Sequence, residues 1–378
     1  MLNDNTTLSS TTTMFEHSEA KVGLYENYLL RYLNILSRSF VKKIYLYDMF
    51  CGEGVYENGG QGSPLMTIDC IARHYRENNN TCPNIAVVFN DKEESKIEPG
   101  KLKVDRVKEF VEAKFIPDQV KIWYTKFSYS DLVKRVIKKL DQLNNNERAL
   151  IFIDPWGYKD IDPNDLKALM KSNKAEVLLF LPISFMYRFA NKAAVSEKFE
   201  GGRPIRKLLD TLYDSITKPY FRDQQHFISE LQIRFKAFSE ATYLDTFKIE
   251  RSANNWFALF FFTNNQKGYW KMLDSKWTID TSSGKAFQKN RAQVSLSTDF
   301  DLHGYRDIVE KYLRQNLNAT NADLLELGLQ NNFLPKHTRQ ILDSIKKDVG
   351  IDIISLDRQP ATSYYLGNED RLVNIKLR

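Results

Sequence analysis

Residues Asp48–Gly54 read DMFCGEG and end the apolar run Ile44–Met49, which is typical of a buried β-strand. Gly52 and Gly54 allow the backbone to turn sharply off this strand and to approach a ligand closely. The next helix is expected only at Pro64, a residue that suits the first helical position. A nicotinamide dinucleotide site would place three glycines directly before the helix, so a nicotinamide oxidoreductase is the weaker interpretation.

Outward from this turn, apolar strands alternate with helical patterns. Five runs are predicted as strands: Ile44–Met49, Ile85–Phe89, Val120–Tyr124, Ala149–Ile153 and Val177–Leu181. Helices are predicted over Lys21–Arg38, Pro64–His74, Leu102–Ala113, Ser130–Leu143 and Pro163–Lys171. Such apolar strands indicate a parallel sheet with helices on both faces, and Tyr243–Ile249 with Trp256–Thr263 predict an antiparallel pair beside it. The fold class is therefore α/β, with a Rossmann-type sheet like that of class I methyltransferases.

Polar residues follow the predicted strands at their carboxyl ends, where open α/β sheets bind ligands. The second strand ends in Asn90 and Asp91, and a carboxylate there suits the two ribose hydroxyls of an adenosyl cofactor because it accepts hydrogen bonds from both. Asp48 would accept hydrogen bonds from the polar tail of the same ligand. The expected cofactor is S-adenosylmethionine, and the candidate binding residues are Asp48, Phe50, Gly52, Gly54, Ser63, Asn90, Asp91 and Ser128.

The fourth strand ends in Ile153–Gly157, which reads IDPWG. Pro155 holds the chain extended, so the Asp154 carboxylate and the Pro155 carbonyl would converge on the hydrogens of an amine. Trp156 would stack on a flat acceptor such as a flipped base. Because methyl transfer is an in-line displacement that depends on alignment, Asp154, Pro155 and Trp156 are the candidate catalytic residues. Alternatively, this is an Asp-Pro turn with a core tryptophan, and the glycine segment is a loop that binds nothing.

The chain has 378 residues, which fits two domains. Residues 1–14 are polar and are predicted to be a disordered leader. Residues 15–281 would form the methyltransferase-like domain, with a helical insertion at 183–241, and the Ser-rich residues 282–299 would form a linker. Residues 300–378 show three helical patterns and then β-like segments at Ile351–Leu356 and Ser363–Leu366, which is the outline of a winged helix.

The formal net charge of +6 is compatible with a polyanionic partner such as nucleic acid. Two groups of basic residues are candidates for phosphate contacts, one in the insertion and one on the helix that a winged fold offers to a groove. They are Arg203, Arg206 and Lys207, and Lys336, Arg339 and Lys346. Such charge runs are equally often solvated helix faces, and that alternative stays open.

The chain holds three cysteines and shows no signal-peptide pattern, which favours the reducing environment of the cytoplasm. Cys70, His74 and Cys82 lie close in sequence but lack a fourth ligand, so no metal site is expected. The longest apolar runs, Val177–Leu181 and Trp256–Phe262, are too short to span a bilayer, and no membrane partner is expected.

Six motifs and the winged-helix-like tail form a set that extends from Lys21 to the C-terminus. The motifs are Tyr25–Tyr32, Tyr47–Gly54, Gly62–Pro64, Phe89–Asp91, Phe152–Gly157 and Leu259–Gly268. As a set they resemble the bacterial three-Cys-motif partner family. That family is similar to class I methyltransferases, and its Asp-Pro-aromatic motif resembles the Asp-Pro-Pro-Tyr motif of amino-methyltransferases that act on nucleic acids. The resemblance implies a partner protein with a three-cysteine motif and a role in defence against phage or mobile DNA.

Two functions of different classes remain. The first is a methyltransferase that acts on the amine of a nucleic-acid base. The second is a DNA- or partner-binding adaptor whose methyltransferase-like domain is not catalytic. The family usually has Ala and Pro where this chain has Cys51 and Glu53, and Glu53 would place a negative charge near the carboxylate of the cofactor. Lys126–Ser128 lacks the Asp or Asn expected to contact adenine, and both departures favour the adaptor.

Overall fold

The structure, a computed structural model, describes residues 14–78, 82–195, 202–213, 219–252, 254–288, 302–356, 361–368 and 370–378. These fall into two compact units. Unit 1 is Met1–Ser275 with Lys285–Asn290, and unit 2 is Lys276–Gly284 with Arg291–Arg378. The predicted leader 1–14 lies, apart from Met14, outside the described residues, as does most of the predicted linker 282–299. Among the residues that are described, no helix is long and apolar enough to cross a membrane.

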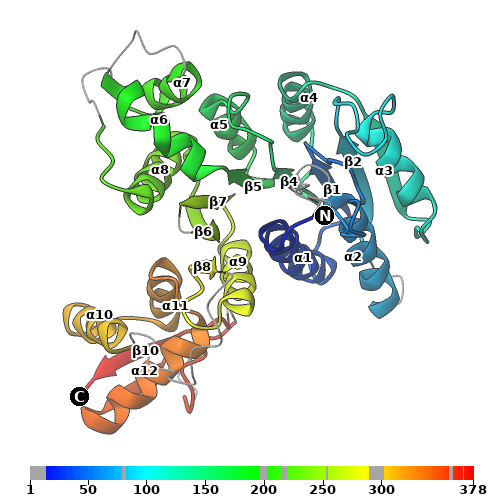
Figure 1. Cartoon of the computed structure of the whole chain (residues 1–378). Helices are drawn as coiled ribbons and strands as arrows, with labels where there is room; N and C mark the ends of the chain where they lie inside the picture. The colour runs from blue at the N-terminus through cyan, green and yellow to red at the C-terminus, as the bar shows by residue number, and fades with distance from the viewer. Residues whose placement is uncertain are drawn as a thin grey trace, which may run out of the picture. The chain divides into compact units, whose positions relative to one another are not determined.

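An eight-stranded, mostly parallel sheet forms the centre of unit 1 in the described part of the chain (Figure 1). Its strands are β1 (Lys43–Asp48), β2 (Asn84–Asn90), β3 (Val120–Thr125), β4 (Glu147–Ile153), β5 (Ala175–Leu181), β6 (Tyr243–Ser252), β7 (Asn255–Thr263) and β8 (Ala286–Gln288). They lie in the order β3-β2-β1-β4-β5-β7-β6-β8. β1 to β5 are parallel, whereas β7 is antiparallel to both β5 and β6. The predicted α/β class and its parallel sheet are confirmed.

Helices cover both faces of this sheet (Figure 1). On one face α1 (Glu16–Ser37), α2 (Ser63–Glu77) and α3 (Lys103–Glu112) pack in succession; on the other lie α4 (Tyr129–Asp141), α5 (Pro163–Lys171) and α8 (Gln224–Ser239). A strand between two helical layers has no solvated side, and β5 is accordingly buried at every residue. This double burial explains why the central strands read as continuous apolar runs rather than as alternating ones.

Where the structure describes it, the segment between β5 and β6 is mainly helical, as predicted for the insertion. It contains α6 (Ile183–Val195), α7 (Arg203–Leu212) and α8. The linker prediction was wrong for the residues of β8, which pair in parallel with β6 at the sheet edge. Three residues with a single aromatic side chain give too short a pattern for a strand to be recognised from sequence.

Among its described residues, unit 2 contains three complete helices, the end of α9 (Gln266–Ile279) and a two-stranded antiparallel sheet. The complete helices are α10 (Leu302–Gln315), α11 (Asn321–Gln330) and α12 (Pro335–Asp348), and the strands are β9 (Ile351–Ser355) and β10 (Val373–Leu377); α9 follows β7. The prediction of a strand at Ser363–Leu366 was wrong, because the partner of β9 is β10. Val373 and Ile375 alternate with half-buried residues and are themselves fully buried, which is the strand pattern that the prediction missed.

Candidate functional site

The carboxyl ends of β1, β2 and β4 meet at one edge of the sheet. The backbone N–H of Met49 donates to the carbonyl of Phe152 at 2.9 Å, and that of Cys51 donates to the carbonyl of Asn90 at 2.9 Å. These bonds extend the pairing of β1 with its two neighbours past the strand ends. The three predicted carboxylates of Asp48, Asp91 and Asp154 are therefore brought together, and Asp48 interacts electrostatically with both of the others.

Asp48 is the most buried of these carboxylates, with 2% of the residue exposed. Its Oδ2 accepts a hydrogen bond of 2.6 Å from the Ser63 hydroxyl, at the first residue of α2. Its Oδ1 is buried and makes no hydrogen bond within the described structure. Burial raises the pKa of Asp48 to about 7. The Ser63 hydroxyl and the nearby backbone N–H of Phe50, which does not meet the geometry of a hydrogen bond, oppose this shift, whereas Asp154 and Asp91 add to it. The end of β1 thus carries a buried acceptor oxygen without a partner.

The glycine turn after β1 requires glycine at both predicted positions. Gly52 and Gly54 have φ of +63° and +76°, in the left-handed region that side chains disfavour. A Cβ on Gly54 would also lie 3.0 Å from a methyl group of Val107 in α3. The turn is closed by a 2.7 Å hydrogen bond from the Gly62 N–H to the Gly54 carbonyl, directly before α2. The predicted delay between the glycines and the helix is therefore a closed loop, residues 54–62.

Asn90 and Asp91, the predicted ribose-binding pair, both hold the backbone at this edge. The Asn90 amide group bonds to the backbone of Met49 and Phe127 and so ties β1, β2 and the segment after β3 together. The Asp91 carboxylate accepts the Gly52 N–H at 3.1 Å and the Glu93 N–H at 2.9 Å. Burial raises the pKa of Asp91. Asn90 has a structural role here, whereas each Asp91 oxygen keeps a further acceptor position.

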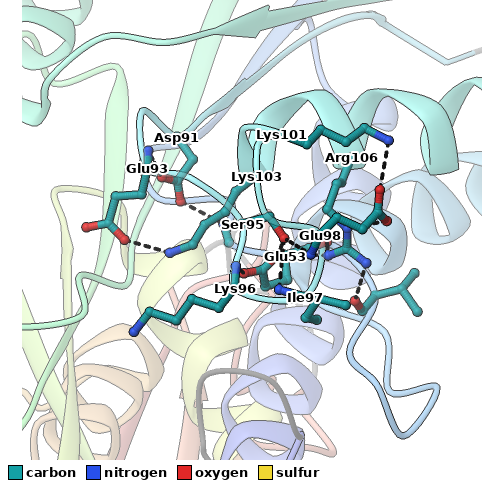
Figure 2. A network of polar contacts seen from close by, with 12 residues as sticks. Glu53, Asp91, Glu93, Ser95, Lys96, Ile97, Glu98, Lys101, Lys103 and Arg106 are labelled. Carbon is teal, nitrogen blue, oxygen red and sulfur yellow. Dashed lines mark hydrogen bonds and ion pairs between the residues drawn. The ribbon is translucent and has the colours of Figure 1, made fainter.

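Glu53 turns away from the sheet edge into a polar network under α3, which Figure 2 shows. Its Oε2 lies 2.7 Å from the guanidinium of Arg106 and accepts the Ser95 hydroxyl at 2.7 Å, while its Oε1 accepts the Lys96 N–H at 2.9 Å. Glu53 and Arg106 are both almost completely buried. The negative charge that favoured a non-catalytic adaptor is therefore neutralised within the protein.

Sequence reasoning missed Arg106, although a signal was present. Arg106 lies in α3 between Val104 and Val107, which are both fully buried. An arginine next to the apolar face of a short amphipathic helix indicates a buried partner of opposite charge. The sequence does not say which of the preceding glutamates that partner is.

Asp154 is paired with a cation that was not predicted, Lys21 of α1. The Lys21 ammonium lies 2.8 and 2.7 Å from the two carboxylate oxygens, and the two side chains are 13% and 25% exposed. The same ammonium lies 5.0 Å from the ring centroid of Phe257. Lys21 precedes Tyr25 and Tyr28 by one and two helical turns, on the face of α1 that is otherwise buried. A lysine on an otherwise buried helix face indicates an acidic partner in the interior, and the sequence contained this signal.

Trp156 is exposed, whereas Pro155 is buried. The tryptophan is 69% exposed, so the interpretation as a core residue was wrong. The Lys96 ammonium, from the loop after β2, lies 5.7 Å from the centroid of its ring. An aromatic ring next to Asp154 is therefore accessible from solution.

Two other predicted cofactor contacts have structural partners. Phe50 stacks on Tyr129 with ring centroids 5.5 Å apart. Ser128 is the N-cap of α4: its hydroxyl oxygen accepts the Asp131 N–H at 3.2 Å, and the hydroxyl lies 2.6 Å from the Asp131 carboxylate. The hydroxyl of Ser128 is thus used by the helix that follows it.

The basic residues proposed for phosphate contacts differ in their surroundings. Arg203 is exposed, Arg206 donates to the Ala193 carbonyl at 3.3 Å, and Lys207 pairs with Asp162 at 3.1 Å. In unit 2, three exposed side chains form one stripe along α12: Lys336, Arg339 and Lys346. Asp343 is exposed within the same stripe and lowers its positive potential.

Two surface hollows of the described structure lie on unit 2. One is lined by Asp307, Glu310, Lys311, Arg314 and Gln315 of α10, and the other by residues of the α10–α11 turn. Neither is lined by residues of unit 1. At the sheet edge, by contrast, Asp154 and Asp91 are engaged by groups of the chain itself.

The chain was compared with protein-family models and with curated proteins, and neither comparison gave a match. The resemblance to the three-Cys-motif partner family rests on the motifs quoted above. Fold alone does not assign a function, so the function is argued from the geometry of the sheet edge.

Proposed function

We propose that this chain is an S-adenosylmethionine-dependent methyltransferase whose acceptor is the amine of a nucleic-acid base. The observation that carries the proposal is the buried Asp48 Oδ1 without a hydrogen-bond partner, at the start of the glycine turn. Leaving a buried acceptor unpaired costs about 1–3 kcal/mol. A cationic group of a ligand would satisfy it, and the ammonium of the methionine portion of the cofactor is such a group.

The strand order supports the same proposal. A parallel 3-2-1-4-5 arrangement, extended by an antiparallel β7 between β5 and β6, is the order of class I methyltransferase sheets. Open α/β sheets bind ligands over the carboxyl ends of their strands. The backbone of Gly52 and Gly54 would hold the methionine portion, and the Asp91 carboxylate the ribose. When bound, the cofactor supplies an electrophilic methyl group.

On the acceptor side, Asp154 and Trp156 would position the base. The Asp154 carboxylate would accept the hydrogens of the amine, and the exposed Trp156 ring would stack on the base. Because Lys21 holds both oxygens of Asp154, the amine would have to displace the lysine ammonium. In unit 2, the three helices followed by a hairpin are consistent with a winged helix that grips nucleic acid.

The Lys21–Asp154 ion pair also favours the second candidate function, a non-catalytic adaptor. A carboxylate that is neutralised by its own chain has lost its acceptor capacity unless the pair opens. In that case the sheet edge would be a structural remnant, and binding to nucleic acid or to a partner protein would be the activity.

Titration calorimetry with S-adenosylhomocysteine tests the proposal. We expect binding by the unaltered protein and affinity at least tenfold lower for Asp48→Asn, because a hydrogen bond to a charged group contributes about 1.5–3 kcal/mol. Asp160→Asn, in the exposed part of the loop after β4, is the matched control and should bind normally. Asp154→Ala should also bind normally but transfer no methyl group to an oligonucleotide. Absence of heat from the unaltered protein, together with salt-sensitive binding of DNA, would establish the adaptor instead.

A further inference from the structure

Two large aromatic side chains are exposed at the carboxyl ends of the neighbouring strands β4 and β5. Trp156 is 69% exposed and Phe185 is 50% exposed. Trp156 lies in the loop after β4, and Phe185 lies in the first turn of α6, which begins directly after β5. Exposed apolar groups that gather in one region mark an interaction surface.

The side chain of Phe185 packs against two other aromatic rings. Its ring centroid lies 5.9 Å from that of Tyr158 and 5.6 Å from that of Phe189. Tyr158 is only 5% exposed and belongs to the same loop as Trp156, so the loop after β4 packs against α6. A ligand that contacts these rings therefore meets side chains that are already held in place, which lowers the entropy lost on binding.

One cation lies against the Trp156 ring, and two more are exposed close by in sequence. The Lys96 ammonium lies 5.7 Å from the Trp156 ring centroid, and Figure 2 shows this side chain extending away from the Glu53 network. Lys159 is exposed in the loop after β4, and Arg188 is exposed one helical turn after Phe185. Within the part of the chain that the structure describes, none of these three cations forms an ion pair. The acids in the same loop are Asp154, which Lys21 neutralises, the exposed Asp160, and Asp162, which pairs with Lys207.

We propose that Trp156, Phe185, Lys96, Lys159 and Arg188 form a binding surface for single-stranded nucleic acid. Rings on which bases stack, interspersed with cations that contact phosphates, are the features by which proteins hold single strands. A duplex keeps the faces of its bases stacked on each other, so the exposed rings have no counterpart there. The proposal rests on the proposed function in one respect, namely that a base of the bound strand reaches Asp154.

Fluorescence anisotropy with the full chain and a labelled thymidine strand of about 12 nucleotides tests this surface. A strand of equal length without bases, and a duplex, are the matched ligands. We expect the thymidine strand to bind about tenfold more tightly than the abasic strand, because stacking contributes roughly 1–3 kcal/mol per base. Trp156→Ala and Phe185→Leu should each weaken binding of the thymidine strand about tenfold. Phe185→Leu keeps an apolar side chain against Tyr158 and so preserves the fold.

Control variants separate the surface from general effects. Phe115→Ala removes a ring that is 72% exposed in unit 1, just after α3, and should leave binding unchanged. Arg188→Ala should lower the slope of log affinity against log salt by about 0.7, whereas Lys121→Ala, exposed on β3, should not.

Equal affinity for the thymidine and abasic strands, or unchanged binding of the thymidine strand by Phe185→Leu, would each overturn the proposal. So would a loss of duplex binding in Phe185→Leu as large as its loss of thymidine-strand binding, whereas duplex binding that this variant leaves unchanged belongs to another surface such as unit 2. Binding and methyl transfer are read separately. If the protein binds the thymidine strand through stacking but transfers no methyl group, the proposed enzyme is refuted and this surface is supported. If it methylates a base but shows no stacking-dependent binding, this surface is refuted and the enzyme is supported.

Discussion

At the scale of single residues, the sheet edge holds buried acids of two kinds. Glu53 has a buried guanidinium, a hydroxyl and a backbone N–H as partners, so its charge is fully compensated. Asp48 has one hydroxyl partner and one oxygen without any. Protein interiors tolerate the first arrangement as structure, whereas the second is more often a place where a ligand completes the bonding. This difference is why we assign binding to Asp48 and packing to Glu53.

The Glu53–Arg106 pair predicts an asymmetric response to mutation. Arg106→Met should lower the free energy of unfolding by about 3–5 kcal/mol, because it leaves a buried carboxylate unpaired. The double variant Glu53→Gln/Arg106→Met should recover part of this loss, since it removes the uncompensated charge. Urea unfolding of the single and double variants measures both effects. A double variant less stable than Arg106→Met alone would show that the hydrogen bonds of Glu53, rather than its charge, matter most.

Glu176 makes the stability of the protein depend on pH. Its buried carboxylate accepts hydrogen bonds from Tyr28 and, at 2.8 Å, from Thr263. Burial raises its pKa from 4.5 to about 7, against the effect of these hydrogen bonds. Because the folded pKa lies above the unfolded one, the stabilisation is complete below pH 4.5 and is lost as the pH rises through 7.

The matched comparison is Glu176→Gln, which keeps the shape but does not titrate. Relative to that variant, the unaltered protein should lose roughly 3 kcal/mol of unfolding free energy between pH 4.5 and pH 8. Urea unfolding at intermediate pH values gives the curve. Asp48 titrates in the same range but is present in both proteins, so its contribution cancels. If the two stability curves run parallel, Glu176 does not titrate in this range.

At the scale of helices and strands, the sequence predicts those features that depend on residues close together in the chain. The central strands are buried on both faces and give apolar runs, and the glycine turn needs positive φ, so both were predicted from residues close in sequence. The Lys21–Asp154 pair joins residues 133 positions apart, so the local pattern around Lys21 indicates a buried acid but not which acid it is. Trp156 shows the same limit, because whether a tryptophan in an Asp-Pro turn is covered depends on elements distant in sequence.

The cap of α4 gives a test of one predicted cofactor contact. Ser128→Ala should lower the free energy of unfolding by about 1 kcal/mol, because the Asp131 N–H loses its acceptor. If capping is its whole role, the affinity for S-adenosylhomocysteine stays unchanged in calorimetry. Ser130→Ala, in the same turn, is the control that keeps the cap. If Ser128→Ala instead kept normal stability but lost affinity for S-adenosylhomocysteine, Ser128 would be a cofactor-binding residue.

At the scale of the whole molecule, the chain builds separate cores. The core of unit 1 contains fully buried residues of β5, such as Leu179, whereas the core of unit 2 contains Leu342, Ile345 and Val373. The two-part division could be anticipated from length and from the change in pattern near residue 300. The assignment of Lys276–Gly284 to unit 2 could not be anticipated, because it depends on which core the end of α9 contacts.

Separate cores predict that the two units respond independently to the loss of buried volume. Leu342→Ala removes a fully buried side chain of unit 2, and Leu179→Ala does the same in unit 1, so each should destabilise its own unit by about 2–5 kcal/mol. In differential scanning calorimetry, each variant should move one transition to lower temperature and leave the other in place. If both variants instead show a single transition that shifts equally, the two units unfold as one cooperative structure. Only strong coupling between the cores would let a cavity in one core destabilise the other.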